Sequence, residues 1–308
     1  MPLAGRGWSG RTVKNSEDKR GSEQRIINPK LTVLAFSAGK QSSALLWMVL
    51  RGEIPRPPHF IVLNADPGME DKRSYPYVDM MEQKCKEASI PFIKVKRNLY
   101  QEILDLKQSG KKRFDTPPFW TKDRKTGKIG RLMQTCTLAY KIVPMDQAMR
   151  KYMEEHLGIP RNRKRLGNNV VCKWIGFSFD EQDRIQQQKR KYIYHEYPLI
   201  DLGYDKKDVD LYFVDRLLPV PPRSVCNACF ANDLAYLKEM HDQRPEDWAK
   251  AVEVDEEVRD LTCIGVRDEC YVFSGCIPLQ VLAKNQFRLD ADVKEQADQR
   301  CSSGHCFL

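Results

Sequence analysis

Long apolar runs are missing from this 308-residue sequence. No stretch approaches the roughly 18 consecutive apolar residues of a membrane-spanning helix, so the sequence predicts no membrane span. Residues 1–30 are polar and basic and contain no apolar core of a secretory signal. We therefore expect residues 1–30 to form a loosely ordered arm of a cytoplasmic protein.

Histidine is scarce, with five residues in the chain. His59, His156, His195 and His241 have no metal-ligand spacing, and the sequence contains neither an H-E-x-x-H motif nor a Ser-His-Asp pattern. These absences argue against a zinc peptidase and against a serine hydrolase.

Cysteine, by contrast, is frequent, with ten residues. A chain without an export signal is expected in the reducing cytosol, where disulfides seldom persist. Metal ligation or sulfur chemistry is then a better explanation for so many thiols than disulfide bonding.

The order of the apolar segments predicts an α/β fold with a parallel sheet. Strand-like runs alternate with helical patterns of crossover length, which places helices on both faces of the sheet. The runs are 32–36, 59–66, 91–97 and 170–178, and helices are expected at 42–53, 75–89, 100–108, 143–155, 234–241 and 246–260. We divide the chain near residue 200, into an α/β nucleotide-binding domain over 31–200 and a mainly helical, cysteine-bearing region over 201–308.

A polar turn joins the first strand to the first helix in the stretch LTVLAFSAGKQSSALL. Unpaired N–H groups at the start of a helix attract anions, and the helix dipole adds to this attraction. Ser37, Ser42 and Ser43 add hydroxyl donors, and Lys40 adds a full positive charge. A Walker A motif is excluded, because it would need glycine where Leu34 stands. The sequence therefore predicts a phosphate site at this turn.

The turn resembles the S-G-G-x-D-S loop of the PP-loop ATPases, the adenine nucleotide α-hydrolase-like proteins. The matching residues are Ser37, Gly39, Lys40, Ser42 and Ser43. Ala38 replaces the middle glycine, and Gln41 replaces the usual aspartate. The resemblance implies a Rossmann-like α/β/α sandwich of the HUP type. Its loop, residues 37–43, would hold the β- and γ-phosphates of ATP, with Mg²⁺, while ATP is cleaved between its α- and β-phosphates.

Two later segments are similar to the phosphoadenosine phosphosulfate (PAPS) reductase-like branch of this superfamily. The matching residues are Asp66, Gly68, Glu70, Tyr75 and Tyr77 in one segment, and Gly176, Asp180, Glu181 and Arg184 in the other. The resemblance implies that Asp66 meets the nucleotide or Mg²⁺ in catalysis, and that Gly176 and Arg184 bind the substrate. Ser178 stands where the branch has an arginine, so the substrate's anionic group is not implied.

A third segment, GRLMQTCTLAYKIVPM, is similar to the cysteine-pair segment of the iron–sulfur sulfonucleotide reductases. The matching residues are Cys136, Lys141 and Pro144. Thr137 replaces the second cysteine, and Cys226-x-x-Cys229 begins 90 positions after Cys136, a separation similar to theirs. The resemblance implies a [4Fe–4S] cluster held by Cys136, Cys226 and Cys229, with Lys141 binding a substrate anion.

A fourth ligand of the cluster is not defined by the sequence. The candidates are Cys172, Cys263, Cys270 and Cys276. We favour Cys276, because it lies in the same C-terminal region as Cys226-x-x-Cys229. A zinc site built from the same cysteines is the alternative.

The C-terminal residues CSSGHCFL carry two further thiols, Cys301 and Cys306. In position they resemble the nucleophilic cysteine on the mobile tail of PAPS reductases, although the usual E-C-G-(I/L)-H motif is missing. A thiol on such a tail can be sulfurated, attack a substrate or close over a site. We therefore predict catalytic roles for Cys301 and Cys306.

Positive charge is in excess, with a formal net charge of +9, and it is clustered. Nine lysines and arginines lie within residues 107–131, against two acidic residues, and Phe114, Phe119 and Trp120 lie among them. Basic side chains beside aromatic ones suit a phosphate backbone and its bases. We expect DNA or tRNA as a partner.

Three functions remain open on these grounds. The first is an enzyme that adenylates an oxygen of a nucleic acid with ATP and then lets sulfur replace it, using an iron–sulfur cluster and a sulfur-donor protein. The second is a sulfonucleotide reductase that acts through a tail cysteine. The third is a non-catalytic nucleic-acid-binding module with a structural metal site. A homo-oligomer is left open, because the sequence does not define the oligomeric state.

Overall fold

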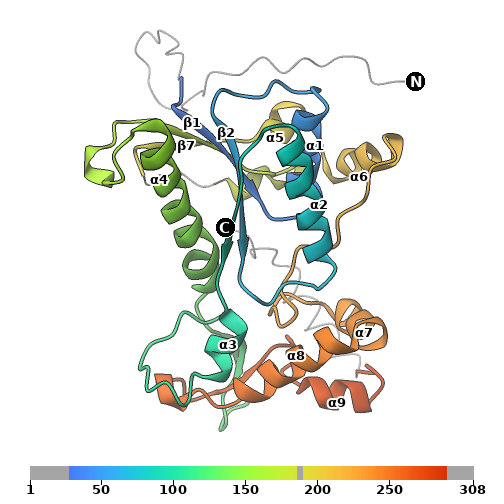
Figure 1. Ribbon diagram of the computed structural model, residues 1–308. Helices are drawn as coiled ribbons and strands as arrows, with labels where there is room; N and C mark the ends of the chain where they lie inside the picture. Colours follow the sequence, from blue (N-terminus) through green and yellow to red (C-terminus); the bar gives the residue numbers. More distant parts are fainter. Residues whose placement is uncertain (1–27, 186–189, 290–308) are drawn as a thin grey trace, which may run out of the picture. The chain divides into compact units, whose positions relative to one another are not determined.

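The computed structural model describes residues 28–185 and 190–289. These residues form two compact units, each built from three chain segments (Figure 1). The sheet unit comprises the described residues within 1–64, 74–94 and 146–223. The cysteine unit comprises those within 65–73, 95–145 and 224–308. The predicted functional division near residue 200 stays a prediction.

A five-stranded sheet with the order β3-β2-β1-β6-β7 confirms the predicted α/β class. The pairs β1–β2, β1–β6 and β6–β7 all run parallel. Its strands are β1 Leu31–Phe36, β2 Phe60–Asp66, β3 Phe92–Lys96, β6 Val171–Trp174 and β7 Ile193–Glu196. The sequence of β1, LTVLAF, is almost wholly apolar, which suits a central strand that is covered on both faces.

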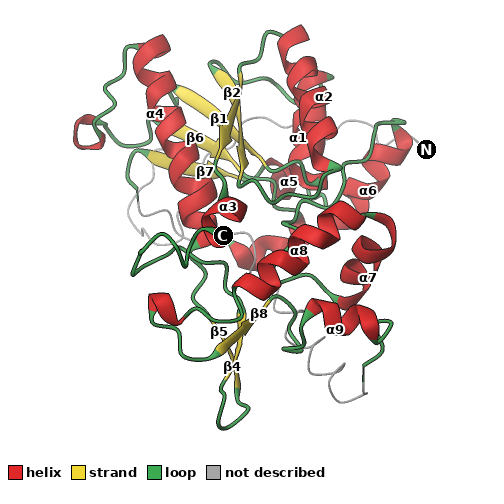
Figure 2. Ribbon diagram, turned by 60° about the horizontal axis from the view of Figure 1, so that its bottom comes forward, coloured by secondary structure: helices red, strands yellow, loops and turns green. Residues whose placement is uncertain are grey.

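Helices cover both faces of this sheet, as expected. Figures 1 and 2 show α1 and α2 on one face and α4 on the other. The helices are α1 Lys40–Leu50, α2 Ser74–Glu87, α4 Val143–Leu157, α5 Pro198–Asp201 and α6 Lys206–Asp215. Because α1 packs between β1 and the pair α5 and α6, it is buried over most of its length. None of the helices within the described residues is long and apolar enough to cross a membrane.

The sheet unit holds two buried ionisable groups and a half-buried one on the α4 side. Lys173 of β6 donates to Asp146 of α4, with 2.6 Å between Nζ and Oδ1. Burial lowers the pKa of Lys173 to about 8. His195 of β7 lies opposite Lys173 in the strand register. Burial, and then the charge of Lys173, lower the pKa of His195 to about 4, so this imidazole is neutral at neutral pH.

We expect this half-buried histidine to make the fold sensitive to mild acid. Below its ordinary pKa of 6.5, His195 takes up a proton in the unfolded chain but not in the folded one until the pH reaches about 4. The free energy of unfolding should therefore fall as the pH drops from about 6.5 towards 4, by up to about 2 kcal/mol at about pH 5. Urea unfolding at about pH 7.5 and about pH 5 measures this loss. His195→Gln should lack this contribution, and an equal loss in both proteins would contradict the prediction.

The cysteine unit combines a small antiparallel sheet with four α-helices. Its strands β4 Trp120–Lys122, β5 Ile129–Arg131 and β8 Glu269–Tyr271 pair in the order β5-β4-β8. Its helices are α3 Leu99–Leu104, α7 Leu234–Gln243, α8 Pro245–Glu257 and α9 Leu279–Lys284. A π-helix spans Thr137–Ile142 and runs into α4. Asp233 caps α7 by accepting from the Tyr236 N–H at 2.7 Å, and Pro245 suits the first position of α8.

One expectation about the basic segment is wrong. Phe119 and Trp120 are buried in apolar clusters of the cysteine unit, and the Trp120 Nε1 donates to the Phe230 carbonyl at 2.9 Å. Neither ring is available to stack on a nucleic-acid base. The sequence shows these aromatic residues among charges, but it does not show that β8 and Phe230 cover them.

Candidate functional site

The turn between β1 and α1 is held in shape by its own serines. The Ser42 Oγ lies 3.2 Å from the Ser37 Oγ and accepts from the Ser37 N–H at 3.3 Å. The Gly39 N–H donates to the Ser37 Oγ at 3.3 Å. Ala38, which stands where the PP-loop pattern has glycine, adopts a left-handed φ of 58°. The chain therefore keeps the backbone turn although the glycine is missing.

The start of α1 presents positive potential without a built-in anion. Gly39 is its N-cap residue, no side chain caps the helix, and its first turn has no acidic residue. The N–H groups of Lys40, Gln41 and Ser42 are those that a helix leaves without a partner in its own backbone. Ser37 and Lys40 are exposed, so an anion can approach this end of the helix.

Two neighbouring carboxylates hold the polar side chains of the turn. The Lys40 Nζ forms an exposed ion pair with Asp210 of α6 at 2.6 Å. The Gln41 Nε2 donates to the Glu181 Oε2 at 3.3 Å. A phosphate at the helix start would compete with Asp210 for the lysine.

Gly176 lies against the backbone of the turn, next to Ser42. A Cβ at this position would lie 2.8 Å from the Ser42 nitrogen and 3.1 Å from its Cα. Glycine is therefore required by the close approach of two backbones. Arg184 lies in the same unit, where its Nη1 donates to the Glu181 Oε1 at 2.6 Å and its guanidinium stacks over Phe177.

In the cysteine unit, Asp66 closes a tight turn after β2. Its Oδ1 accepts from the Gly68 N–H at 2.7 Å. Gly68 has a φ of 80°, and a Cβ there would lie 2.9 Å from the Arg97 carbonyl oxygen. This contact is the turn-forming role of an aspartate, and the predicted role of Asp66 towards nucleotide or Mg²⁺ stays a prediction.

Cys136, Cys226 and Cys229 gather in the cysteine unit. All three pack against its main apolar core. Burial raises the pKa of Cys226 well above its ordinary value. The nearby Cys229 and Cys136 raise this pKa further. Burial likewise raises the pKa of Cys136, against the opposing charge of Lys141. Without a bound metal, these groups are thiols at neutral pH.

A carboxylate and an ammonium group lie beside these thiols. The Lys141 Nζ binds the Glu70 Oε1 at 2.7 Å, and the Cys226 Sγ is 3.9 Å from the same oxygen. Burial alone would lower the pKa of Lys141, but the charge of Glu70 and the nearby thiols outweigh it and raise the pKa. The Glu70 Oε2 is buried and has no hydrogen-bond partner in the described part of the chain.

The Cys226 turn is fixed to the segment that carries Glu70. Glu70 and Cys226 form an antiparallel bridge. The Asn227 N–H donates to the Met69 carbonyl at 2.7 Å, and the Asp71 N–H donates to the Val225 carbonyl at 3.2 Å. The position of the first cysteine of the pair is therefore set by backbone pairing.

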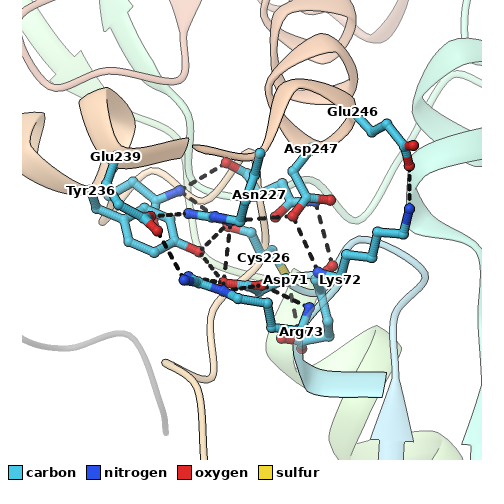
Figure 3. Close-up of polar contacts among 12 residues, drawn as sticks. Asp71, Lys72, Arg73, Cys226, Asn227, Tyr236, Glu239, Glu246 and Asp247 are labelled. Carbon is cyan, nitrogen blue, oxygen red and sulfur yellow. Dashed lines mark hydrogen bonds and ion pairs between the residues drawn. The ribbon is translucent and has the colours of Figure 1, made fainter. Parts of the chain in front are cut away.

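A buried polar network continues this attachment into α7 and α8 (Figure 3). The Arg244 Nη1 lies 3.2 Å from both the Asp71 Oδ2 and the Asp247 Oδ2, and its Nη2 binds Glu239 at 2.5 Å. Asn227 donates to the Asp247 Oδ1 at 3.0 Å. Burial alone would raise the pKa of Asp71, but hydrogen bonds from Arg73 and the charge of Arg244 outweigh it and lower the pKa.

The three thiols are of the ligand type that both an iron–sulfur cluster and a zinc ion take. Within residues 28–185 and 190–289, no group of three or more His, Cys, Asp or Glu side chains is placed to hold one metal ion. A tetrahedral zinc site brings its sulfur ligands close together, whereas a [4Fe–4S] cluster spreads its thiolates around a larger core. Three neighbouring thiols, a buried cation and a buried carboxylate oxygen without a partner are compatible with the larger group.

The structure brings the predicted residues together in two groups. Residues 37–43, Gly176 and Arg184 belong to the sheet unit, and the three cysteines, Lys141 and Asp66 belong to the cysteine unit. Cys276 is buried with Trp120, Phe230 and Tyr271 in a small cluster against which Cys229 also packs. Its role as fourth ligand stays a prediction. Cys301 and Cys306 lie outside the described residues.

The sequence reading missed the polar network. The motif that contains Glu70 implies no role for it, and no motif includes Asp71, Asn227, Arg244 or Asp247. Their partners are distant in the sequence, and isolated polar residues do not recur with the period of a helix or a strand. The one available signal was acidic Asp247 in the first turn of a helix that begins with proline.

Comparisons with known proteins give a likeness among solved structures alone. Neither a protein-family model nor a curated protein sequence matches the chain. Among solved structures, the chain is similar to the U34-tRNA thiolase NcsA from Methanococcus maripaludis with its [4Fe-4S] cluster. The two chains are 14% identical, with a TM-score of 0.39, and the alignment covers 79% of this chain and 75% of that one. At this identity and score the likeness does not assign the chain to a family.

Proposed function

We propose that this protein is a PP-loop ATP pyrophosphatase of the PAPS reductase-like type that adenylates an oxygen of a nucleic acid so that sulfur can replace it. The observation that carries the proposal is the uncapped start of α1. There, three backbone N–H groups have no partner in the helix backbone, and the exposed Ser37 and Lys40 and the buried Ser42 lie beside them. This set of donors suits the outer phosphates of ATP.

The proposed reaction is a substitution at the α-phosphorus. The acceptor oxygen forms the new bond to phosphorus, and pyrophosphate leaves with the electrons of the bridging P–O bond. Negative charge grows on the leaving pyrophosphate, where Lys40 and the N–H groups of the turn would stabilise it. Mg²⁺ would add to this stabilisation. A sulfide-level sulfur then displaces AMP from the activated carbon, with no net oxidation or reduction.

The cysteine unit would supply the sulfur-handling part. Cys136, Cys226 and Cys229 would hold the proposed [4Fe–4S] cluster, whose chemistry is to bind and deliver sulfur. Lys141 places a positive charge beside these thiols, which would favour their ionised, ligating forms. Glu70 keeps that lysine in position.

Lys40→Ala tests the ATP part of this proposal. We expect pyrophosphate release from ATP to fall by roughly 100-fold, because a positive charge opposite the developing negative charge is lost. Release by the unaltered protein should rise when DNA or tRNA is added. The lysine is half-exposed and its ion pair with Asp210 is a surface pair, so the variant should fold.

Asp210→Asn is the matched control. It breaks the same ion pair but leaves the lysine in place, so pyrophosphate release should persist. Equal losses in both variants would show that the pair has a structural role and would overturn the assignment of Lys40. Formation of sulfite from PAPS, lost in Cys301→Ser or Cys306→Ser, would point to the reductase instead. Nucleic-acid binding without either product would point to the non-catalytic module.

A further inference from the structure

We propose that the basic hairpin, residues 120–131, binds the phosphate backbone of a double-helical nucleic acid without reading its bases. This inference rests on the proposed action on nucleic acid, and it identifies the binding element and the form of the partner. The hairpin consists of β4, β5 and the loop 123–128 between them. Figure 2 shows it projecting from the small sheet of the cysteine unit.

The hairpin and the segment before it carry a dense set of exposed cations. All nine lysines and arginines within residues 107–131 are exposed. Four have partners: Lys107 with Glu257, Lys111 with Glu102, Arg124 with Asp260, and Arg131 over the Trp120 and Phe230 rings. The other five have no acidic partner within 4.0 Å among the residues that the structure describes. These five are Lys112, Arg113, Lys122, Lys125 and Lys128.

The fold gives the cations of the hairpin a fixed backbone. The Asp123 Oδ1 accepts from the N–H groups of Lys125 and Thr126 at 2.9 and 2.6 Å, and Gly127 supplies the left-handed φ of 70° that the loop needs. The Asp123 N–H donates to the Lys128 carbonyl at 2.9 Å. The acidic residue of the loop is therefore used to form the turn, while the lysine side chains remain in solvent.

The aromatic side chains of this segment are not exposed, and this favours one form of nucleic acid over another. Proteins that bind single strands stack the bases on exposed rings. In this segment Phe119 and Trp120 are buried, and Phe114 is half-buried near the Lys111 ammonium. Only charge is left for recognition. A double helix hides its bases and presents regularly spaced phosphates, which lysine and arginine bind without regard to sequence.

An acidic protein is a poorer fit to the same surface. Protein interfaces are depleted in lysine and gain affinity from buried aromatic residues. Six of the nine cations are lysines, and no exposed aromatic side chain lies among them. Such a surface gains binding free energy mainly by releasing the counterions of a polyanion.

The experiment compares two triple variants of the full chain. The hairpin variant is Lys122→Gln, Lys125→Gln and Lys128→Gln. The control variant removes the same charge at three exposed lysines elsewhere: Lys86→Gln, Lys207→Gln and Lys284→Gln. Fluorescence anisotropy measures binding to a short RNA duplex, a DNA duplex of the same sequence and the single strand, between about 50 and about 200 mM salt. Thermal unfolding by circular dichroism verifies that both variants fold.

We expect the hairpin variant to bind duplex about tenfold or more weakly, with a slope of log K against log salt reduced by about 2 to 3. The control variant should bind like the unaltered protein. Equal binding by all three proteins, or a preference for the single strand, would overturn the inference. Stronger binding to polyglutamate than to duplex, lost in the hairpin variant, would overturn it in favour of an acidic protein. Pyrophosphate release measured without nucleic acid should be unchanged in the hairpin variant, so failure of the proposed ATP chemistry is recognised separately.

Discussion

Replacing Gly176 with alanine is expected to lower ATP-dependent pyrophosphate release by roughly 100-fold without changing a phosphate-binding side chain. The new methyl group would lie 2.8 Å from the backbone nitrogen of Ser42, a contact that real Cβ atoms do not make. Because the opposing atoms are backbone, the first turn of α1 must move. A shift of part of an ångström at a site of charge stabilisation lowers the rate roughly 100-fold.

The same overpacking should lower the free energy of unfolding by about 1–3 kcal/mol. Gly167→Ala is the control, because a Cβ there has its nearest neighbour at 4.0 Å, in the Val170 side chain. That variant should keep both its activity and its stability. ATP binding by calorimetry and pyrophosphate release are measured on all three proteins. If Gly176→Ala retained both, residues 37–43 would not be the phosphate site.

The parts of the fold that the sequence predicted are those with long apolar patterns. The runs at 32–36, 59–66, 91–97 and 170–178 became β1, β2, β3 and β6, and the helical periods gave α1, α2, α4, α7 and α8. A central parallel strand such as β1 is buried on both faces, so its whole sequence is apolar and stands out. The three-residue strands β4, β5 and β8 are too short to establish an alternation, and β4 and β5 lie within a charge-rich segment.

The sequence predicts a candidate site where its residues are consecutive, and it does not predict polar groups that are assembled from distant residues. Seven consecutive residues at one strand–helix junction predict an anion-binding turn, and the structure places all seven at the junction of β1 and α1. The polar network needs Asp71 and Arg244, which are far apart in the sequence, and no spacing rule connects them. Trp120 is a residue for which the sequence predicts the wrong exposure. Its charged neighbours in the sequence indicate an exposed side chain, but Phe230, which is distant in the sequence, packs against it.

Replacing the buried Arg244 with alanine is expected to destabilise the cysteine unit strongly. Arg244 is 9% exposed and faces Asp71, Asp247 and Glu239. Without it, Asp247 and Asp71, which are 3% and 0% exposed, lose the cation between them. Removing one partner of a buried ionic network leaves an uncompensated charge and lowers the free energy of unfolding by about 3–5 kcal/mol. Urea unfolding followed by circular dichroism measures this loss.

The network's attachment to the Cys226 turn gives a second expected result. Asn227 binds Asp247 through its side chain and Met69 through its backbone, so collapse of the network should free the turn. Native-state alkylation of Cys226, followed by mass spectrometry on metal-free protein, should accelerate in Arg244→Ala. Lys72→Ala breaks a neighbouring ion pair with Glu246 that is exposed on both sides, and exposed pairs contribute little. That variant should match the unaltered protein in stability and alkylation rate, and equal behaviour of the two variants would show that the network does not hold the cysteine turn.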